Sequence, residues 1–236
     1  MRIKTLILAL ILTLLAASVL AECPEAREPG ADYVWQIRRE EPVAESWFAD
    51  AWLMGDSITE SLANVDAIPE LNIEIKIGQS PQGAVHNRDY VVDGQYYSMA
   101  EYVISRQPAK LLVMLGSNGL DHSPRLQVQE SYHELLDMLL AALPDTELYL
   151  VSVTPITPQA TQRYPKLTMP AIKYFNQEMA WLAEEHGVHY VDVYTPLLNE
   201  SKTQIDERYC TGDGIHLTRA GAMKVAEAIR LQVGEE

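Results

Sequence analysis

Five short apolar runs recur along this chain, and segments with helical periodicity separate them. The runs lie at residues 51–54, 71–77, 110–115, 147–153 and 188–194. Each has the length of a strand and is rich in aliphatic residues, which is typical of strands that are buried on both faces. Strands that alternate with helices in this way predict a parallel sheet with helices on both sides. We therefore expect an α/β fold built on a five-stranded parallel sheet.

Three segments between or after these runs carry apolar residues at helical spacing. Residues three and four apart fall on one face of a helix. The three stripes are Val128, Tyr132, Leu135, Leu136 and Leu139; Ile172, Phe175, Met179 and Leu182; and Ala222, Val225, Ala226 and Ile229. No internal repeat or linker divides this part of the chain, so we expect one domain at residues 49–236. A polar, irregular arm at residues 22–48 precedes it.

The first 21 residues resemble a secretory signal peptide. Arg2 and Lys4 precede an apolar stretch that ends in Val19-Leu20-Ala21, and a basic segment, an apolar stretch and a small residue at the cleavage position are the marks of such a peptide. An uncleaved membrane anchor is the alternative, although the stretch is short for a span of about 20 residues. We therefore expect a secreted protein with no stable membrane insertion after cleavage.

The charge of the chain argues against polyanionic partners. It has 18 basic and 33 acidic residues, for a formal net charge of −15. Because the predicted signal peptide contains two of the basic residues and none of the acidic ones, the mature chain would carry −17. Such a surface repels nucleic acid and anionic lipid, and no basic stripe offsets it. We expect no nucleic-acid partner.

The chain has two cysteines, Cys23 and Cys210. An even number of cysteines in an oxidising compartment permits one disulfide. Cys23 is alternatively a site of lipid attachment, which would anchor the protein to a membrane, but Glu22 stands where lipoproteins have a small residue. Neither cysteine belongs to a CxxC pair and no other metal motif is present, so we expect no metal site.

Ser57, Asp213 and His216 have the residue types and the order of a nucleophilic triad. Ser57 lies in Gly55-Asp56-Ser57, directly after the first apolar run, and Asp213 precedes His216 by three residues. A serine hydroxyl needs an adjacent base to take its proton, and that base needs a third group to orient it. Taken singly, Ser57 is also explained as a helix cap and Asp213-Gly214 as a turn.

Gly78 and Asn118 follow the second and third apolar runs. In open parallel sheets, ligands bind beyond the carboxyl ends of the strands, where Ser57 and His216 are also expected. A backbone N–H at Gly78 and the side-chain amide of Asn118 are donors suited to an oxyanion. Each residue alone is also explained as part of an ordinary turn.

Together these motifs resemble the SGNH hydrolases, also called GDSL esterases. The matching positions are Gly55-Asp56-Ser57, Gly78, Gly116-Ser117-Asn118, and Asp213 with His216. The resemblance implies a flavodoxin-like three-layer α/β/α sandwich that needs no cofactor. It also implies that Ser57 is the nucleophile, His216 the general base and Asp213 its orienting partner, with an oxyanion hole formed by Ser57, Gly78 and Asn118.

One position departs from the family pattern, because Gly119 stands where the family has an aspartate that braces the loop. The resemblance alone implies that Gly119→Asp leaves activity equal or higher.

The substrate is predicted from the loops at residues 78–97, 119–125 and 155–168, which we expect to line the site. They are rich in tyrosine and amide side chains, which suit a polar, ring-shaped ligand better than a long acyl chain. These side chains are Tyr90, Tyr96, Tyr97, Tyr164, Gln79, Asn87, Gln159 and Gln162. We expect a secreted esterase acting on short acyl groups, above all acetyl, of a small molecule or glycan. The alternatives are a lipase or lysophospholipase, and a glycan-binding module with a weakened site.

Overall fold

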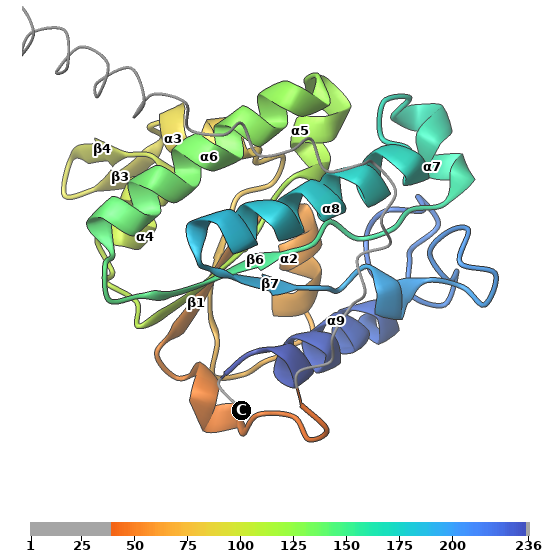
Figure 1. Ribbon diagram of the computed structural model, residues 1–236, viewed down its shortest axis with the longest axis horizontal. Helices are drawn as coiled ribbons and strands as arrows, with labels where there is room; N and C mark the ends of the chain where they lie inside the picture. The colour runs from red at the N-terminus through yellow and green to blue at the C-terminus, as the bar shows by residue number, and fades with distance from the viewer. Residues whose placement is uncertain (1–38, 235–236) are drawn as a thin grey trace, which may run out of the picture. The chain divides into compact units, whose positions relative to one another are not determined.

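The computed structural model describes residues 39–234 (Figure 1). The predicted signal peptide at residues 1–21, Cys23 and residues 22–38 of the predicted arm lie outside the described residues. The described residues all belong to one compact unit.

The five predicted strands form one parallel sheet in the order β2-β1-β5-β6-β7. Their bounds are β1 Ala51–Gly55, β2 Asn72–Ile75, β5 Lys110–Met114, β6 Glu147–Val151 and β7 His189–Val191. Each pair of neighbours is parallel, with Leu53 of β1 opposite Ile73 of β2 and Leu112 of β5. The predicted five-stranded parallel sheet is therefore confirmed, although four of its five strands end before the apolar runs do.

Helices cover both faces of this sheet (Figure 1). The three predicted amphipathic helices are α6 Arg125–Ala142, α8 Met169–His186 and α9 Arg219–Gln232. On one face α6 packs against α8 and against the shorter helices α3 Pro81–His86, α4 Met99–Ile104 and α5 Ser117–His122. On the other face α9 packs against α2 Ser57–Ala63, beside the 3-10 turn η2 Thr195–Leu197. The fold is thus the expected three-layer α/β/α sandwich.

The segment before β1 packs onto the domain. The 3-10 turn η1 Glu45–Phe48 buries Phe48 completely. The Val43 N–H donates to the carbonyl of Arg230 in α9 at 2.9 Å, and the Arg230 guanidinium pairs with Glu45 at 2.9 Å. The described end of the predicted arm is therefore held by the last helix, a contact that its polar composition did not indicate.

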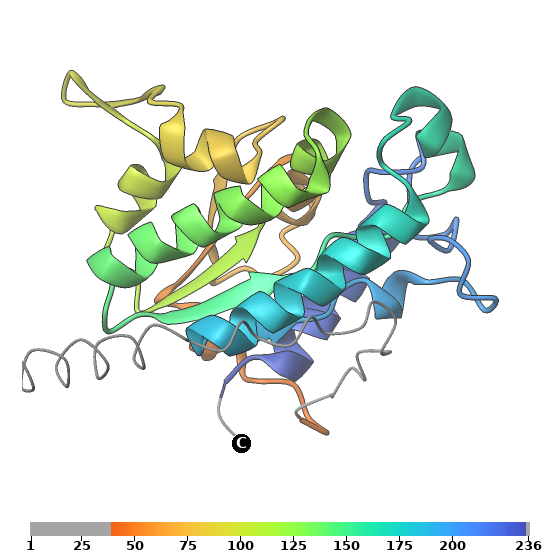
Figure 2. The same cartoon turned by 45° about the horizontal axis from the view of Figure 1, so that its top comes forward.

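A short hairpin, β3 Tyr90–Val92 and β4 Gln95–Tyr97, interrupts the long loop expected after β2. Tyr90 stacks on Tyr102 of α4, with ring centroids 5.1 Å apart, whereas Tyr96 remains 63% exposed. Figures 1 and 2 both place the hairpin at the opposite end of the molecule from α7 Pro158–Arg163. Tyr90 thus packs on α4 and Tyr96 faces solvent, and the prediction that the tyrosines of this segment line the site stays a prediction.

Candidate active site

Ser57 begins the helix that follows the first strand. Asp56 is the N-cap of α2, and its Oδ1 accepts the Ile58 N–H at 2.9 Å. Ser57 is therefore the first helical residue and not the cap, which rules out the capping explanation for this serine. Gly55 makes the turn possible, because a Cβ there would lie 1.9 Å from Thr59 Oγ1 and 3.0 Å from the Met114 carbonyl oxygen.

The structure brings Ser57, His216 and Asp213 into one hydrogen-bonded series. His216 Nε2 lies 3.0 Å from Ser57 Oγ, although the two residues are 159 positions apart. The other ring nitrogen, Nδ1, lies 2.6 Å from Asp213 Oδ2. The His216 and Asp213 side chains are 39% and 34% exposed, so the series is open to a ligand from solvent. An imidazole held between a carboxylate and a hydroxyl is arranged to move a proton from that hydroxyl.

The second oxygen of Asp213 holds the carboxylate in position. Asp213 Oδ1 accepts from Thr211 Oγ1 at 2.8 Å, from the Ile215 N–H at 2.9 Å and from the His216 N–H at 3.1 Å. Burial raises the pKa of Asp213, but the bonds from His216, Ile215 and Thr211 outweigh burial and hold this pKa well below its usual range. Asp213 is therefore an anion that accepts hydrogen bonds in this site and takes no proton from His216.

Backbone contacts fix the loop that carries Asp213 and His216. The Thr211 N–H donates to the His216 carbonyl at 2.7 Å, and the Thr157 N–H donates to the Gly214 carbonyl at 3.0 Å. Gly214 has φ +77°, and a Cβ there would lie 1.9 Å from Thr157 Oγ1. Thr218 then caps α9 by accepting the Gly221 N–H. The helix start that was expected after His216 is present and fixes the end of the loop.

Asn118 reaches the nucleophile turn through Asp56. Gly116, with φ +144°, turns the chain from β5 into α5, so that Ser117 and Asn118 occupy its first turn. Asp56 Oδ2 accepts from Asn118 Nδ2 at 2.7 Å and from Ser117 Oγ at 2.9 Å. A second, longer bond joins Asn118 Nδ2 to the Gln79 carbonyl at 3.2 Å. The two loops after β1 and β5 are thus joined through one carboxylate.

The sequence analysis assigned no role to Asp56, although it stands inside the nucleophile motif. Its side chain is only 2% exposed, and burial raises its pKa, opposed by the hydrogen bonds from Ile58, Ser117 and Asn118. The available signal was its position between a strand and a helix, where an aspartate is a preferred cap.

Gly78 lies in the turn that follows β2. Its φ of +75° is a conformation that favours glycine, and nothing lies within 4 Å of a Cβ placed there. The turn is closed by the Gln79 N–H, which donates to the Lys76 carbonyl at 3.1 Å. The bond from this turn to Asn118 is made by Gln79, one residue later. The predicted role of Gly78 as an oxyanion donor therefore stays a prediction.

Gly119 is buried against two neighbouring helices. A Cβ at this position would lie 2.8 Å from Val128 Cγ1 and 3.4 Å from Pro81 Cδ. The glycine therefore allows α5 to approach α6 and α3 closely. The aspartate of the family pattern would therefore fit here only if Val128 or the helices shifted.

Cys210 is buried next to the loop that carries Asp213 and forms no disulfide within residues 39–234. Because Cys23 lies outside the described residues, the disulfide between them stays a prediction. Among residues 39–234, no three His, Cys, Asp or Glu side chains are grouped as metal ligands, and no helix is long and apolar enough to cross a membrane.

Comparisons with known proteins identify the family of this chain. The family model for the GDSL-like lipase/acylhydrolase family matches residues 53–224. A GDSL esterase/lipase of Arabidopsis thaliana is 25% identical over 158 residues, which is 59% of this chain and 64% of that protein. The match thus spans less than two thirds of the relative's length.

Two solved structures share the fold. One is a GDSL-like lipase from Bacteroides thetaiotaomicron, with a TM-score of 0.58 and 18% identity over 80% of this chain and 91% of that one. The other is a variant of an acetyl-xylooligosaccharide esterase from Geobacillus, with a TM-score of 0.55 and 18% identity over 79% and 94%. Because the family model covers most of the chain, the resemblance drawn from the motifs is confirmed: the protein belongs to the GDSL-like lipase/acylhydrolase family.

Proposed function

We propose that this protein is a serine esterase that hydrolyses short-chain acyl esters, above all acetyl esters on carbohydrate. One observation carries the proposal of an esterase. Ser57 Oγ lies 3.0 Å from His216 Nε2, and Asp213 Oδ2 lies 2.6 Å from His216 Nδ1. A serine in contact with a carboxylate-oriented imidazole is the arrangement that acyl transfer requires.

In the first half of the reaction, His216 Nε2 takes the proton from Ser57 Oγ as this oxygen attacks the ester carbonyl carbon. The tetrahedral intermediate then collapses: the bond from carbon to the leaving oxygen breaks, and the proton on His216 passes to that oxygen. Alcohol departs and Ser57 carries the acyl group. In the second half, His216 takes a proton from water, whose oxygen attacks the acyl carbon, and then returns the proton to Ser57 as the acid leaves.

Two donors are available for the oxyanion that forms in each half. The Ser57 N–H lies in the first turn of α2, where N–H groups have no intrahelical acceptor. Asn118 Nδ2 has two hydrogens, of which one is held by Asp56 at 2.7 Å and the other bonds more weakly to the Gln79 carbonyl at 3.2 Å. We infer that the oxyanion replaces the Gln79 carbonyl as the acceptor of this second hydrogen, while the bond to Asp56 keeps the amide in place. Gly78 remains the proposed third donor.

The acetyl-carbohydrate part of the proposal has less support. A structural neighbour is an acetyl-xylooligosaccharide esterase, and the predicted site loop at residues 155–168 contributes Gln159 to a polar cavity beside the catalytic loop. A lipase or lysophospholipase is the second candidate, favoured by the GDSL-like lipase among the neighbours. A glycan-binding module without activity is disfavoured by the contact between Ser57 and His216.

We also propose that the protein is exported, on the strength of residues 1–21 alone. The alternatives are retention by an uncleaved signal and lipidation at Cys23. Intact mass of the protein recovered from its native host distinguishes the three.

The experiment that tests the activity is a panel of p-nitrophenyl esters from acetate to palmitate, run on wild type and Ser57→Ala. We expect acetate and butyrate to be cleaved faster than octanoate and longer esters, and Ser57→Ala to be inactive. A phosphonate that labels active serines should attach once, at Ser57. Full activity in Ser57→Ala would refute the esterase mechanism, whereas faster cleavage of palmitate than of acetate would favour the lipase.

A further inference from the structure

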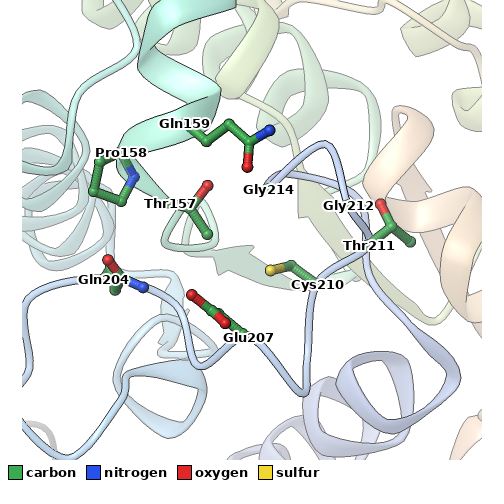
Figure 3. A pocket seen from close by; sticks show the side chains of 9 residues that line it. All are labelled: Thr157, Pro158, Gln159, Gln204, Glu207, Cys210, Thr211, Gly212 and Gly214. Carbon is green, nitrogen blue, oxygen red and sulfur yellow. The ribbon is translucent and has the colours of Figure 1, made fainter.

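A cavity of about 420 Å³ lies beside the catalytic loop (Figure 3). The start of α7, including Gln159, forms one wall, and the segment that contains Gln204, Glu207 and Cys210 forms another. The third wall includes Thr211, Gly212 and Gly214, which flank Asp213 in the chain. The volume falls within the range of about 300–1,000 Å³ that is usual for small-molecule sites.

Three polar side chains at this cavity are free to bind a ligand. Gln159, Gln204 and Glu207 make no side-chain hydrogen bond within residues 39–234. Figure 3 shows the two amides, the Glu207 carboxylate and the Cys210 thiol directed toward the same space. The two amides offer both donors and acceptors, whereas the carboxylate only accepts.

The chemistry of these groups selects a class of ligand. No basic side chain lines the cavity, and Glu207 would repel an anionic ligand. A long acyl chain would cover two amides and a carboxylate without giving them hydrogen bonds, which is unfavourable. A neutral compound rich in hydroxyl groups satisfies all three, because each hydroxyl both donates and accepts.

The cavity also adjoins the loop that carries the catalytic base. The backbone that forms its wall carries His216, which the proposed mechanism makes the proton donor to the leaving oxygen, and the Thr211 hydroxyl at the wall donates to Asp213 at 2.8 Å. We propose that this cavity is a subsite for a neutral sugar unit of the leaving alcohol. The inference rests on the proposed esterase function and specifies its substrate as an oligosaccharide ester rather than the ester of a small alcohol.

The test compares Gln159→Ala and Gln204→Ala with wild type on two substrates, an acetylated xylo-oligosaccharide and p-nitrophenyl acetate. Loss of one hydrogen bond corresponds to a roughly two- to tenfold rise in KM for the oligosaccharide. Activity on p-nitrophenyl acetate should stay unchanged, because this ester has no sugar unit. Gln127→Ala is the matched control, since Gln127 is an exposed amide of α6 outside the cavity lining and should behave as wild type on both substrates.

Direct binding supplies a second readout. Calorimetry should show the unacetylated xylo-oligosaccharide binding to Ser57→Ala and binding several-fold more weakly to Ser57→Ala/Gln204→Ala. Three outcomes would overturn the subsite. They are wild-type KM values in both cavity variants, an equal loss of activity on both substrates, and no binding of the oligosaccharide to Ser57→Ala. If the wild type cleaves p-nitrophenyl acetate but releases no acetate from the oligosaccharide, the carbohydrate part of the proposed function fails. The calorimetric result then decides the subsite alone: binding weakened by Gln204→Ala supports it and absent binding overturns it.

Discussion

Replacing Gly119 by aspartate restores the family's motif, yet the structure predicts a damaged protein. Gly119 is buried in the first turn of α5, and a Cβ there would lie 2.8 Å from Cγ1 and 3.3 Å from Cγ2 of Val128. The Val128 side chain is 3% exposed, and its branched Cβ leaves few rotamers to which it can move. The added atom must therefore push α5 away from α6.

The size of the effect follows from two opposing terms for Gly119→Ala. Overpacking a buried site costs about 1–3 kcal/mol, while the better helix propensity of alanine returns at most about 1 kcal/mol. We expect a net loss of roughly 0–3 kcal/mol in the free energy of unfolding for alanine. Gly119→Asp should lose more, because its carboxylate would also enter a buried space next to Val128 and Pro81.

The same displacement should reach the chemistry, because Asn118 precedes Gly119 and bonds Asp56 at 2.7 Å. Urea unfolding and kcat on p-nitrophenyl acetate, measured for both variants, test this. Val128→Ala is the compensating change: it removes both methyl groups that clash, so Gly119→Ala should be less damaging in that background, with a coupling of about 0.5 kcal/mol or more. A Gly119→Asp protein as stable as wild type, with equal or higher kcat, would refute the packing argument.

Three further outcomes follow from the site. Asn118→Ala should lower kcat by about 10²–10³ with little change in KM, because the amide acts on charge that exists only in the transition state; a change confined to KM would contradict this. Thr211→Val removes a donor to Asp213, so the pKa of Asp213 should rise when the Asp213 carboxyl signal is titrated by NMR, with Thr211→Ser restoring it; an unmoved pKa in the valine variant would show that the hydroxyl is not needed. Non-reducing peptide mapping should find Cys23 joined to Cys210. Chain-entropy models predict that a bridge closing so long a loop stabilises the folded protein by about 5 kcal/mol. Free thiols or a lipid on Cys23 would exclude the bridge.

The sheet and the long helices were predictable because apolar residues that become buried recur in their sequences as short runs or at helical spacing. The strands β1, β5 and β6 are almost entirely buried, whereas the edge strand β2 is only partly buried. Val128, Tyr132 and Leu135 recur on the core side of an 18-residue helix. The triad was predictable because Ser57, Asp213 and His216 belong to compact motifs, although their contact spans 159 positions.

The shorter elements gave no comparable signal. Helices α3, α5 and α7 have six residues each, which is less than two helical turns and too few for an apolar stripe to repeat. Helices α3 and α7 begin instead at local caps, Ser80 before Pro81 and Thr157 before Pro158. The space around Gly119 depends on side chains from α3 and α6, so a pattern of neighbours in the sequence does not report it.

Asp56 shows why a buried carboxylate stands next to the nucleophile. Its two oxygens face only donors: the Ile58 N–H on Oδ1, and Ser117 Oγ and Asn118 Nδ2 on Oδ2, the latter two 61 and 62 positions away. An asparagine at this position would place its NH₂ group where one carboxylate oxygen now lies. That NH₂ would face the N–H or O–H donors that bond this oxygen, and buried donors would be left without an acceptor. A carboxylate accepts them all, and the N-terminal end of α2 favours its negative charge. One buried side chain therefore sets both the start of the helix that carries Ser57 and the position of the amide proposed to bind the oxyanion, so that the nucleophile and the oxyanion donor cannot shift independently.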